Sequence, residues 1–130
     1  MINIPLRVKN LIKRHGTASP RQIAADLGFK VFIYGDMPRK INGLWRRVLW
    51  RKYIFVDDKL ADWQQDAVIA HELAHFLCHK GYKLYSMNGR TYYCETRKER
   101  EADTFAAELM RHYTDLAPEC VLDFLANGWR

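Results

Sequence analysis

Two histidines and a glutamate near the middle of the 130-residue sequence have the types and spacing of a metal-dependent hydrolase site. His71 and His75 are four residues apart, so on a helix they project from the same face, one turn apart, and can clamp one metal ion. Glu72 is displaced by about a quarter turn, from where its carboxylate can reach an attacking water without binding the metal itself. Zinc needs one more protein ligand and an open position for water. The spacing therefore predicts a catalytic zinc site with Glu72 as the general base.

The alternative is a chance HExxH pattern in an ordinary helix. The residues around the motif are mostly Ala, Val, Ile, Leu and Phe, which predicts a largely buried helix. Two histidines and a glutamate are costly to bury without partners, and a metal ion supplies partners for all three. The setting of the motif therefore favours the metal site.

The third metal ligand must come from another segment, and a second predicted helix offers acidic residues. Glu99 and Asp103 are four residues apart and share a face of that helix. Glu99 can bind the metal, while Asp103 can accept a hydrogen bond from the far ring nitrogen of His71 or His75 and so fix its tautomer. A solvated helix surface is the alternative for these acids, because basic residues lie nearby in the sequence.

Two further residues are rival ligands. Glu101 lies about 200° around the helix from Glu99, so we favour Glu99 as the ligand over Glu101. His79 follows His75 by one helical turn. A histidine in that place more often supports a ligand from behind or carries positive charge at a helix end, and we prefer either role to metal binding.

Two long helices must position these residues, one over about 62–79 and one over about 95–112. Apolar residues recur at spacings of three and four in both segments, as in Trp63, Ala67, Ala70 and Ala74 of the first. A tyrosine-rich stretch over 81–93 joins them as an irregular or hairpin connection. Its tyrosines, at 82, 85, 92 and 93, either pack this connection, which we favour, or line a substrate cleft. Pro118 opens a short final helix.

The first 29 residues are predicted to be helical. One helix ends at Gly16, and a second has Ser19 as its N-cap, Pro20 at its first position and Gly28 as its stop. Residues 30–57 are instead rich in β-branched and aromatic side chains, with strand-like runs at 31–34, 44–50 and 53–56. Turn residues lie at 36–38 and 42–43, and Arg51-Lys52 separates the last two runs. The fold class is therefore α+β, with a small antiparallel sheet of about three strands packed on the active-site helix and additional helices.

Composition and hydropathy predict a soluble protein that stays in the cytoplasm. A length of 130 residues with 48% apolar content suits one domain over 1–130, and no segment resembles a signal peptide or a membrane span. Three widely spaced cysteines, at 78, 94 and 120, predict no disulfide framework and suit a reducing compartment. The net charge of +6 is concentrated in Arg39–Lys52, which could bind nucleic acid or an acidic protein partner. Solvated strand faces are usually charged, and we favour that interpretation over a nucleic-acid site.

A resemblance to a known family rests on two of these segments. His71-Glu72-Leu73-Ala74-His75 is followed by a second segment, EREADTFAAELM, at 99–110. Together they resemble the ImmA/IrrE family of metallopeptidases, which typically shows HELxH and then ExxAN-xFAaxLL. The strands that end at Asp57 also resemble the sheet of that family, so the likeness covers roughly residues 20–112. Asp103 stands where asparagine is common, and it suits the same role of hydrogen-bond acceptor.

The resemblance implies a zincin-like fold with a reduced, thermolysin-type core. It implies that His71, His75 and Glu99 bind one Zn²⁺, as in gluzincins, in which a glutamate is the third protein ligand. It also implies that Glu72 is the general base. Mn²⁺ or another divalent metal is an alternative ion. The implied activity is that of an endopeptidase that cuts a helix-turn-helix transcriptional repressor of a phage or mobile element. The alternative is a non-proteolytic binding partner of a repressor or of a toxin-antitoxin component. An intact Glu72 argues against that alternative, because a purely structural metal site has no use for a general base.

Overall fold

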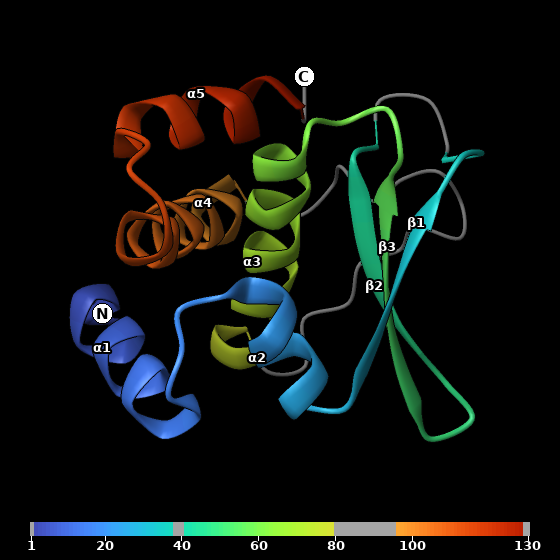
Figure 1. Cartoon of the computed structure of the whole chain (residues 1–130), viewed down its shortest axis with the longest axis horizontal. Helices are drawn as coiled ribbons and strands as arrows, with labels where there is room; N and C mark the ends of the chain where they lie inside the picture. The colour runs from blue at the N-terminus through green and yellow to red at the C-terminus, as the bar shows by residue number, and fades with distance from the viewer. Residues whose placement is uncertain (1, 38–40, 80–95, 129–130) are drawn as a thin grey trace.

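The computed structural model describes residues 2–37, 41–79 and 96–128. Within these residues, three strands form one sheet, and five helices lie to one side of it (Figure 1). The elements in chain order are α1 (Ile4–His15), α2 (Pro20–Asp26), β1 (Phe29–Tyr34), β2 (Gly43–Val48), β3 (Arg51–Asp57), α3 (Asp62–Cys78), α4 (Thr96–Tyr113) and α5 (Pro118–Gly128).

Helix α3 lies at the centre of the fold. The sheet packs on one side of it and α4 on the other, with α5 beyond its amino end; α2 packs on α3 and β1, and α1 packs on α4 (Figure 1). Residues 67–75 of α3 are buried without interruption. A helix that is buried all round must contact other elements on every face, and α3 does so because it lies between two layers.

Local capping explains the two amino-terminal helices, and both predicted helices are confirmed. The side chain of Asn3 accepts a hydrogen bond from the Leu6 N–H at 3.2 Å, and α1 ends at Gly16, whose φ of 71° suits glycine. The Ser19 hydroxyl accepts from the Gln22 N–H at 3.3 Å and caps α2. The predicted long helices at 62–79 and 95–112 correspond to α3 and α4 within one residue at each end.

The sheet is mixed, so the prediction of an antiparallel sheet is wrong for one of its two pairings. The strand order is β1-β3-β2, with β3 parallel to β1 and antiparallel to β2. Strand β3 takes the centre because Ile54 and Val56 are its fully buried residues and face α3. The chain therefore crosses from β1 to the far edge before it returns as β3.

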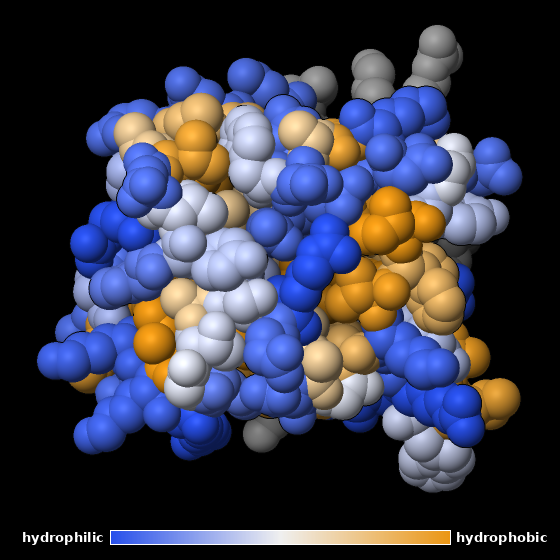
Figure 2. Space-filling view, viewed as in Figure 1, coloured by the Kyte–Doolittle hydropathy of each residue, from blue (hydrophilic) through white to orange (hydrophobic). Residues whose placement is uncertain are grey.

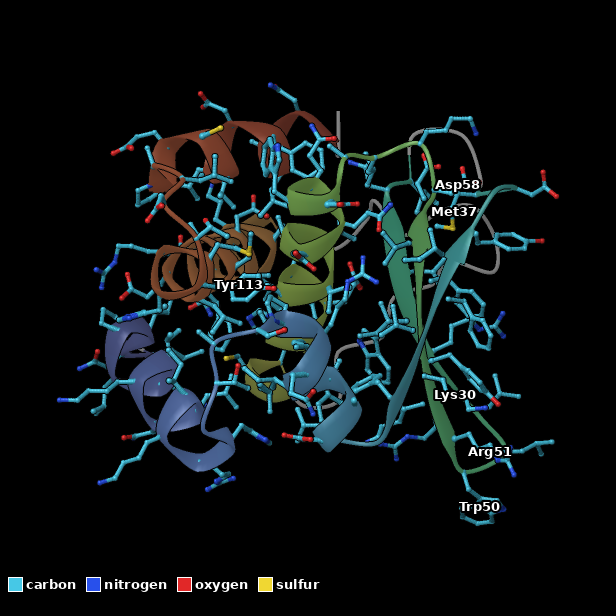
Figure 3. All side chains as sticks on the ribbon, in the orientation of Figure 1. Lys30, Met37, Trp50, Arg51, Asp58 and Tyr113 are labelled. Carbon is cyan, nitrogen blue, oxygen red and sulfur yellow. The ribbon has the colours of Figure 1, made fainter. Side chains whose placement is uncertain are left out.

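The hairpin between β2 and β3 turns two residues earlier than predicted. Leu49 and Trp50 form the turn, whereas Arg51 and Lys52 belong to β3. Both turn residues have positive φ, 48° and 75°, which is the backbone of a two-residue hairpin turn that usually contains Asn-Gly. Leu49 is 83% exposed. Trp50 is 95% exposed and projects from the tip of the hairpin (Figure 3). The sequence predicted that both residues belong to a strand, because both are apolar.

The position of Gly43 sets how closely the sheet approaches α3. A Cβ atom at this position would overlap Cγ1 of Val68 and would lie 2.9 Å from the Phe55 carbonyl oxygen. Gly43 was expected to be a turn residue, but it is the buried first residue of β2. Its lack of a side chain allows β2 to lie directly against the helix that carries the histidines.

Among the described residues, no helix combines the length and the apolar character that a bilayer crossing requires. The face of the molecule in Figure 2 is mostly hydrophilic, and its largest apolar area lies over the sheet.

Replacing Gly43 with alanine should destabilise the protein. Overpacking of this kind typically costs about 1–3 kcal/mol, because Val68 and the β3 backbone must both shift. Urea unfolding measures the change. Gly35→Ala is the matched control, since its Cβ would meet only the flexible carboxylate of Asp58 and should change stability little. Equal effects of the two substitutions would contradict the close-approach role of Gly43.

Replacing Leu49-Trp50 with Asn-Gly should stabilise the protein by about 1 kcal/mol, because left-handed backbone costs roughly 1–2 kcal/mol per ordinary residue. Few contacts are lost, since both side chains are exposed. The midpoint of urea unfolding should rise. Leu6→Gln removes an exposed apolar side chain from an ordinary helical backbone and should leave the midpoint unchanged. A lower midpoint for the Asn-Gly variant would show that the turn is not strained.

Candidate metal centre

The residues of the HExxH motif are buried in the carboxyl-terminal half of α3. The exposed fractions of His71, Glu72 and His75 are 1%, 0% and 1%. The rings of His71 and His75 face Glu99 of α4, and Glu72 lies beside the backbone of Trp45 in β2, so these polar groups meet the rest of the fold instead of water. Polar groups buried this deeply require partners from the facing elements.

Glu99, in the first turn of α4, supplies a carboxylate that meets both histidines. Its Oε1 lies 3.3 Å from Nε2 of His71, and its Oε2 lies 2.7 Å from Nε2 of His75. The two Nε2 atoms are 3.2 Å apart. Ligand atoms of all three residues lie within 4.8 Å of one another, so the group could hold a metal ion.

The chemistry and spacing of this group fit zinc. Two imidazoles and one carboxylate are a ligand set of catalytic zinc sites, which leave a fourth position open. Ligands at normal zinc bond lengths in a tetrahedral site lie about 3.3 Å apart, and two of the three separations here, 3.2 and 3.3 Å, agree with that value. The 2.7 Å contact between Glu99 and His75 is shorter.

Asp103 approaches His71 from behind the cluster. Its Oδ1 lies 2.8 Å from Nδ1 of His71, although the oxygen is off the ideal direction of the ring N–H. This contact leaves Nε2 of His71 facing Glu99. Asp103 was predicted to contact either His71 or His75, and the structure shows that it contacts His71.

Glu72 lies beside the cluster but outside it. Its Oε2 is 3.9 Å from Nε2 of His71, and neither carboxylate oxygen makes a hydrogen bond of normal geometry within the described part of the chain. Burial raises the pKa of Glu72 to about 8, although the charge of His71 and the nearby backbone of Trp45 act to lower it. A buried carboxylate left without such a bond is costly, which is typical of a functional group.

The three metal-binding candidates have strongly perturbed pKa values. Burial acts to lower the pKa of His71, but its contacts with Asp103 and Glu99 outweigh this and raise the pKa to about 10. Burial lowers the pKa of His75 to about 4. Burial acts to raise the pKa of Glu99, but the two histidines lower it to about 2. The Glu99 carboxylate is therefore charged, as a metal ligand must be.

The rival ligands Glu101 and His79 meet each other. Oε1 of Glu101 lies 3.0 Å from Nε2 of His79, and Nδ1 of His79 lies 2.9 Å from Nδ1 of His75. Neither belongs to the cluster of His71, His75 and Glu99. Both residues were predicted as alternatives to the metal ligands, but their contact with each other was not predicted. The repeated spacing of four residues from His71 through His75 to His79 was the available indication.

The basic segment does not present all its charges to solvent. Arg46, Arg47 and Arg51 are exposed, and Arg51 lies beside the hairpin tip (Figure 3). Lys52 instead donates a hydrogen bond to the Leu27 carbonyl, and its ammonium group lies 4.5 Å from the centre of the Phe76 ring. Burial and the neighbouring Arg47 lower the pKa of Lys52. Lys52 therefore stabilises the fold and is not part of a free basic surface.

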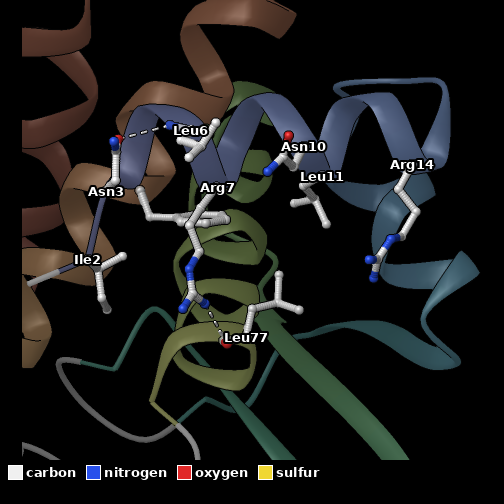
Figure 4. Close-up of a pocket in the computed structure, with 9 residues that line it drawn as sticks. Ile2, Asn3, Leu6, Arg7, Asn10, Leu11, Arg14 and Leu77 are labelled. Carbon is white, nitrogen blue, oxygen red and sulfur yellow. Dashed lines mark hydrogen bonds between the residues drawn. The ribbon is translucent and has the colours of Figure 1, made fainter.

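A groove of about 590 Å³ lies away from the cluster, between α1 and the end of α3 (Figure 4). Leu6, Leu11, Leu77 and Phe105 supply apolar walls, and Arg7 donates a hydrogen bond to the Leu77 carbonyl at 3.5 Å. Among the described residues that line it, none belongs to the histidine cluster.

Some predicted features fall outside the described residues. These are Arg39, Lys40, Cys94 and the whole stretch 81–93 with its tyrosines. Of the remaining cysteines, Cys78 and Cys120 are free thiols.

Comparisons with known proteins found a family model and relatives of this chain. Residues 24–120 match the model of the IrrE N-terminal-like domain, a peptidase family. The chain is 30% identical to uncharacterized immunity region protein 2 of Bacillus phage phi105, over 82% of this chain and 67% of the phage protein. It is 29% identical to metallopeptidase ImmA of Bacillus subtilis (strain 168), over 80% of this chain and 60% of ImmA. The chain thus matches only part of the length of each relative.

No solved structure matches the chain significantly. The family match covers residues that span the histidine cluster and most of the fold. The resemblance found in the two motif segments is therefore confirmed, and the chain belongs to the ImmA/IrrE family of metallopeptidases, whose model describes the IrrE N-terminal-like domain.

Proposed function

We propose that the chain is a zinc-dependent endopeptidase, with His71, His75 and Glu99 as the metal ligands and Glu72 as the general base. One observation above the others supports this function. Two buried histidines and the partly buried Glu99 lie directly beside Glu72, a buried glutamate whose carboxylate makes no normal hydrogen bond with the described residues. A structural metal site needs only the first feature, whereas hydrolysis needs both.

The roles of the residues follow from their positions. Zinc held by His71, His75 and Glu99 would act as a Lewis acid that polarises the scissile carbonyl and lowers the pKa of the attacking water. The Glu72 carboxylate takes the proton of that water and then delivers it to the leaving amine. Asp103, 2.8 Å from Nδ1 of His71, holds the ring so that Nε2 stays directed at Glu99.

The fold and the substrate are parts of the same proposal. A helix with HExxH packed between a small sheet and a second helix that carries a glutamate suits a zincin-like, thermolysin-type core. The two relatives carry the names of a phage immunity region protein and of a metallopeptidase. These names favour a protein substrate in a phage immunity system, and we propose a helix-turn-helix repressor encoded beside this chain.

Zinc should raise the thermal stability of the protein, because a ligand that binds only the folded state stabilises it in proportion to its affinity. The midpoint of thermal unfolding should rise on addition of Zn²⁺ and fall again with a chelator. Glu99→Gln should remove most of this response, whereas Glu108→Gln should keep it, because Glu108 pairs with Arg111 on the exposed side of α4. A full zinc response in the Glu99→Gln protein would remove Glu99 from the ligand set.

Glu72→Gln should retain zinc binding but lose cleavage. The amide occupies the same space but accepts no proton, and loss of a general base typically costs 10²–10⁴-fold in rate, so the activity should fall at least about 100-fold. The assay incubates the zinc-loaded protein with the repressor encoded by the adjacent gene and follows a discrete cut by mass spectrometry. Glu108→Gln serves as the control and should cut normally.

Unchanged cleavage by the Glu72→Gln protein would exclude Glu72 as the base. If the wild-type protein binds the repressor stably and does not cut it, the result would instead favour the role of a non-proteolytic binding partner.

A further inference from the structure

The second ring nitrogen of His75 faces another histidine. Nδ1 of His75 lies 2.9 Å from Nδ1 of His79, while Nε2 of His75 faces Glu99 in the cluster. His79 is 6% exposed, so this contact is buried. The backbone N–H of His79 also donates to the His75 carbonyl at 3.0 Å, which fixes the place of His79 at the end of α3.

Glu101 determines which nitrogen of His79 can accept a hydrogen bond. Its Oε1 lies 3.0 Å from Nε2 of His79, and a carboxylate accepts hydrogen bonds, so Nε2 of His79 carries the proton. Nδ1 of a neutral His79 is then an acceptor, and it accepts a hydrogen bond from the Nδ1–H of His75. The result is a directed chain in which His75 donates to His79 and His79 donates to Glu101.

This chain leaves the lone pair of His75 on Nε2, the atom that faces the other candidate ligands. Metal-binding histidines usually donate their other ring N–H to a partner that fixes the tautomer and the orientation of the ring. Asp103 occupies that position for His71. The residues His79 and Glu101 occupy it for His75, with a histidine inserted between the ligand and the carboxylate.

We propose that His79 and Glu101 are positioning residues that act through His75 and set the affinity and geometry of the metal centre. This inference rests on the proposed function, because it assumes that His75 binds the metal. It assigns roles to the two residues that were rivals for the metal itself. It also makes α4 the source of the groups behind both histidines, because Asp103 and Glu101 lie on that helix.

The test measures metal binding and not activity. Zinc affinity is determined by competition with a chromophoric chelator for the wild-type protein, His79→Phe, Glu101→Ala and the double variant. Glu108→Ala is the matched control, since it removes a carboxylate from the same helix at a site that faces Arg111 and His112. The visible absorption of the cobalt-loaded proteins provides a second readout, which reports ligand geometry and which a purely structural role would not change. Circular dichroism shows which variants are folded, and Glu101→Ala decides the question if His79→Phe does not fold.

Loss of partners of this kind typically costs 10–100-fold in metal affinity, so we expect a loss of about that size in each single variant. The double variant should bind as weakly as His79→Phe alone, because Glu101 acts only through His79. The cobalt absorption should shift in Glu101→Ala and not in Glu108→Ala.

Zinc affinity and cobalt absorption of Glu101→Ala equal to those of the wild type would overturn the inference. A double variant whose loss of zinc affinity equals the product of the two single losses would also overturn it, because the two residues would then act separately. A wild-type protein that binds no metal would overturn the proposed function, and this inference with it. Wild-type binding with unchanged variants would overturn the inference alone.

Discussion

The burial of polar groups on α3 is the constraint on which the rest of the structure depends. His71, Glu72 and His75 are almost completely buried in a helix that is covered on every side. Removing imidazoles and a carboxylate from water costs several kcal/mol unless each finds a partner. The fold meets this cost by placing a helix rich in carboxylates, α4, directly against that part of α3.

Three acidic residues of α4 provide partners for the histidines of α3. Glu99 meets the Nε2 atoms of both motif histidines, Asp103 lies behind His71, and Glu101 lies behind His79. Their spacing of two residues places Glu101 on a different side of α4 from Glu99 and Asp103, so it meets the end of α3 and not the cluster. Glu72 receives no such partner among the described residues. This difference supports the proposed division between a general base, Glu72, and groups that bind or orient the metal ligands.

Patterns local in the chain predicted much of this arrangement. The caps at Ser19 and Gly16 and the apolar periodicity defined the helices, because these features depend on neighbouring residues. Helical spacing alone grouped His71 with His75 and Glu99 with Asp103. The order of the strands could not be predicted in this way, because the parallel pairing of β1 with β3 depends on which strand best covers α3. The hairpin turn was misplaced because Leu49 and Trp50 adopt a backbone that their side chains disfavour. The pairing of His79 with Glu101 depends on the register between two helices, which local spacing does not determine.

The most direct test of the central claim is X-ray absorption at the zinc edge of the loaded protein. A centre built from His71, His75 and Glu99 predicts one zinc ion per chain, with two imidazole nitrogens and with oxygen as the remaining ligands. The spectrum should contain no sulfur at about 2.3 Å, the distance of a cysteine ligand. Sulfur coordination, or a zinc ion with fewer than two imidazoles, would contradict the account.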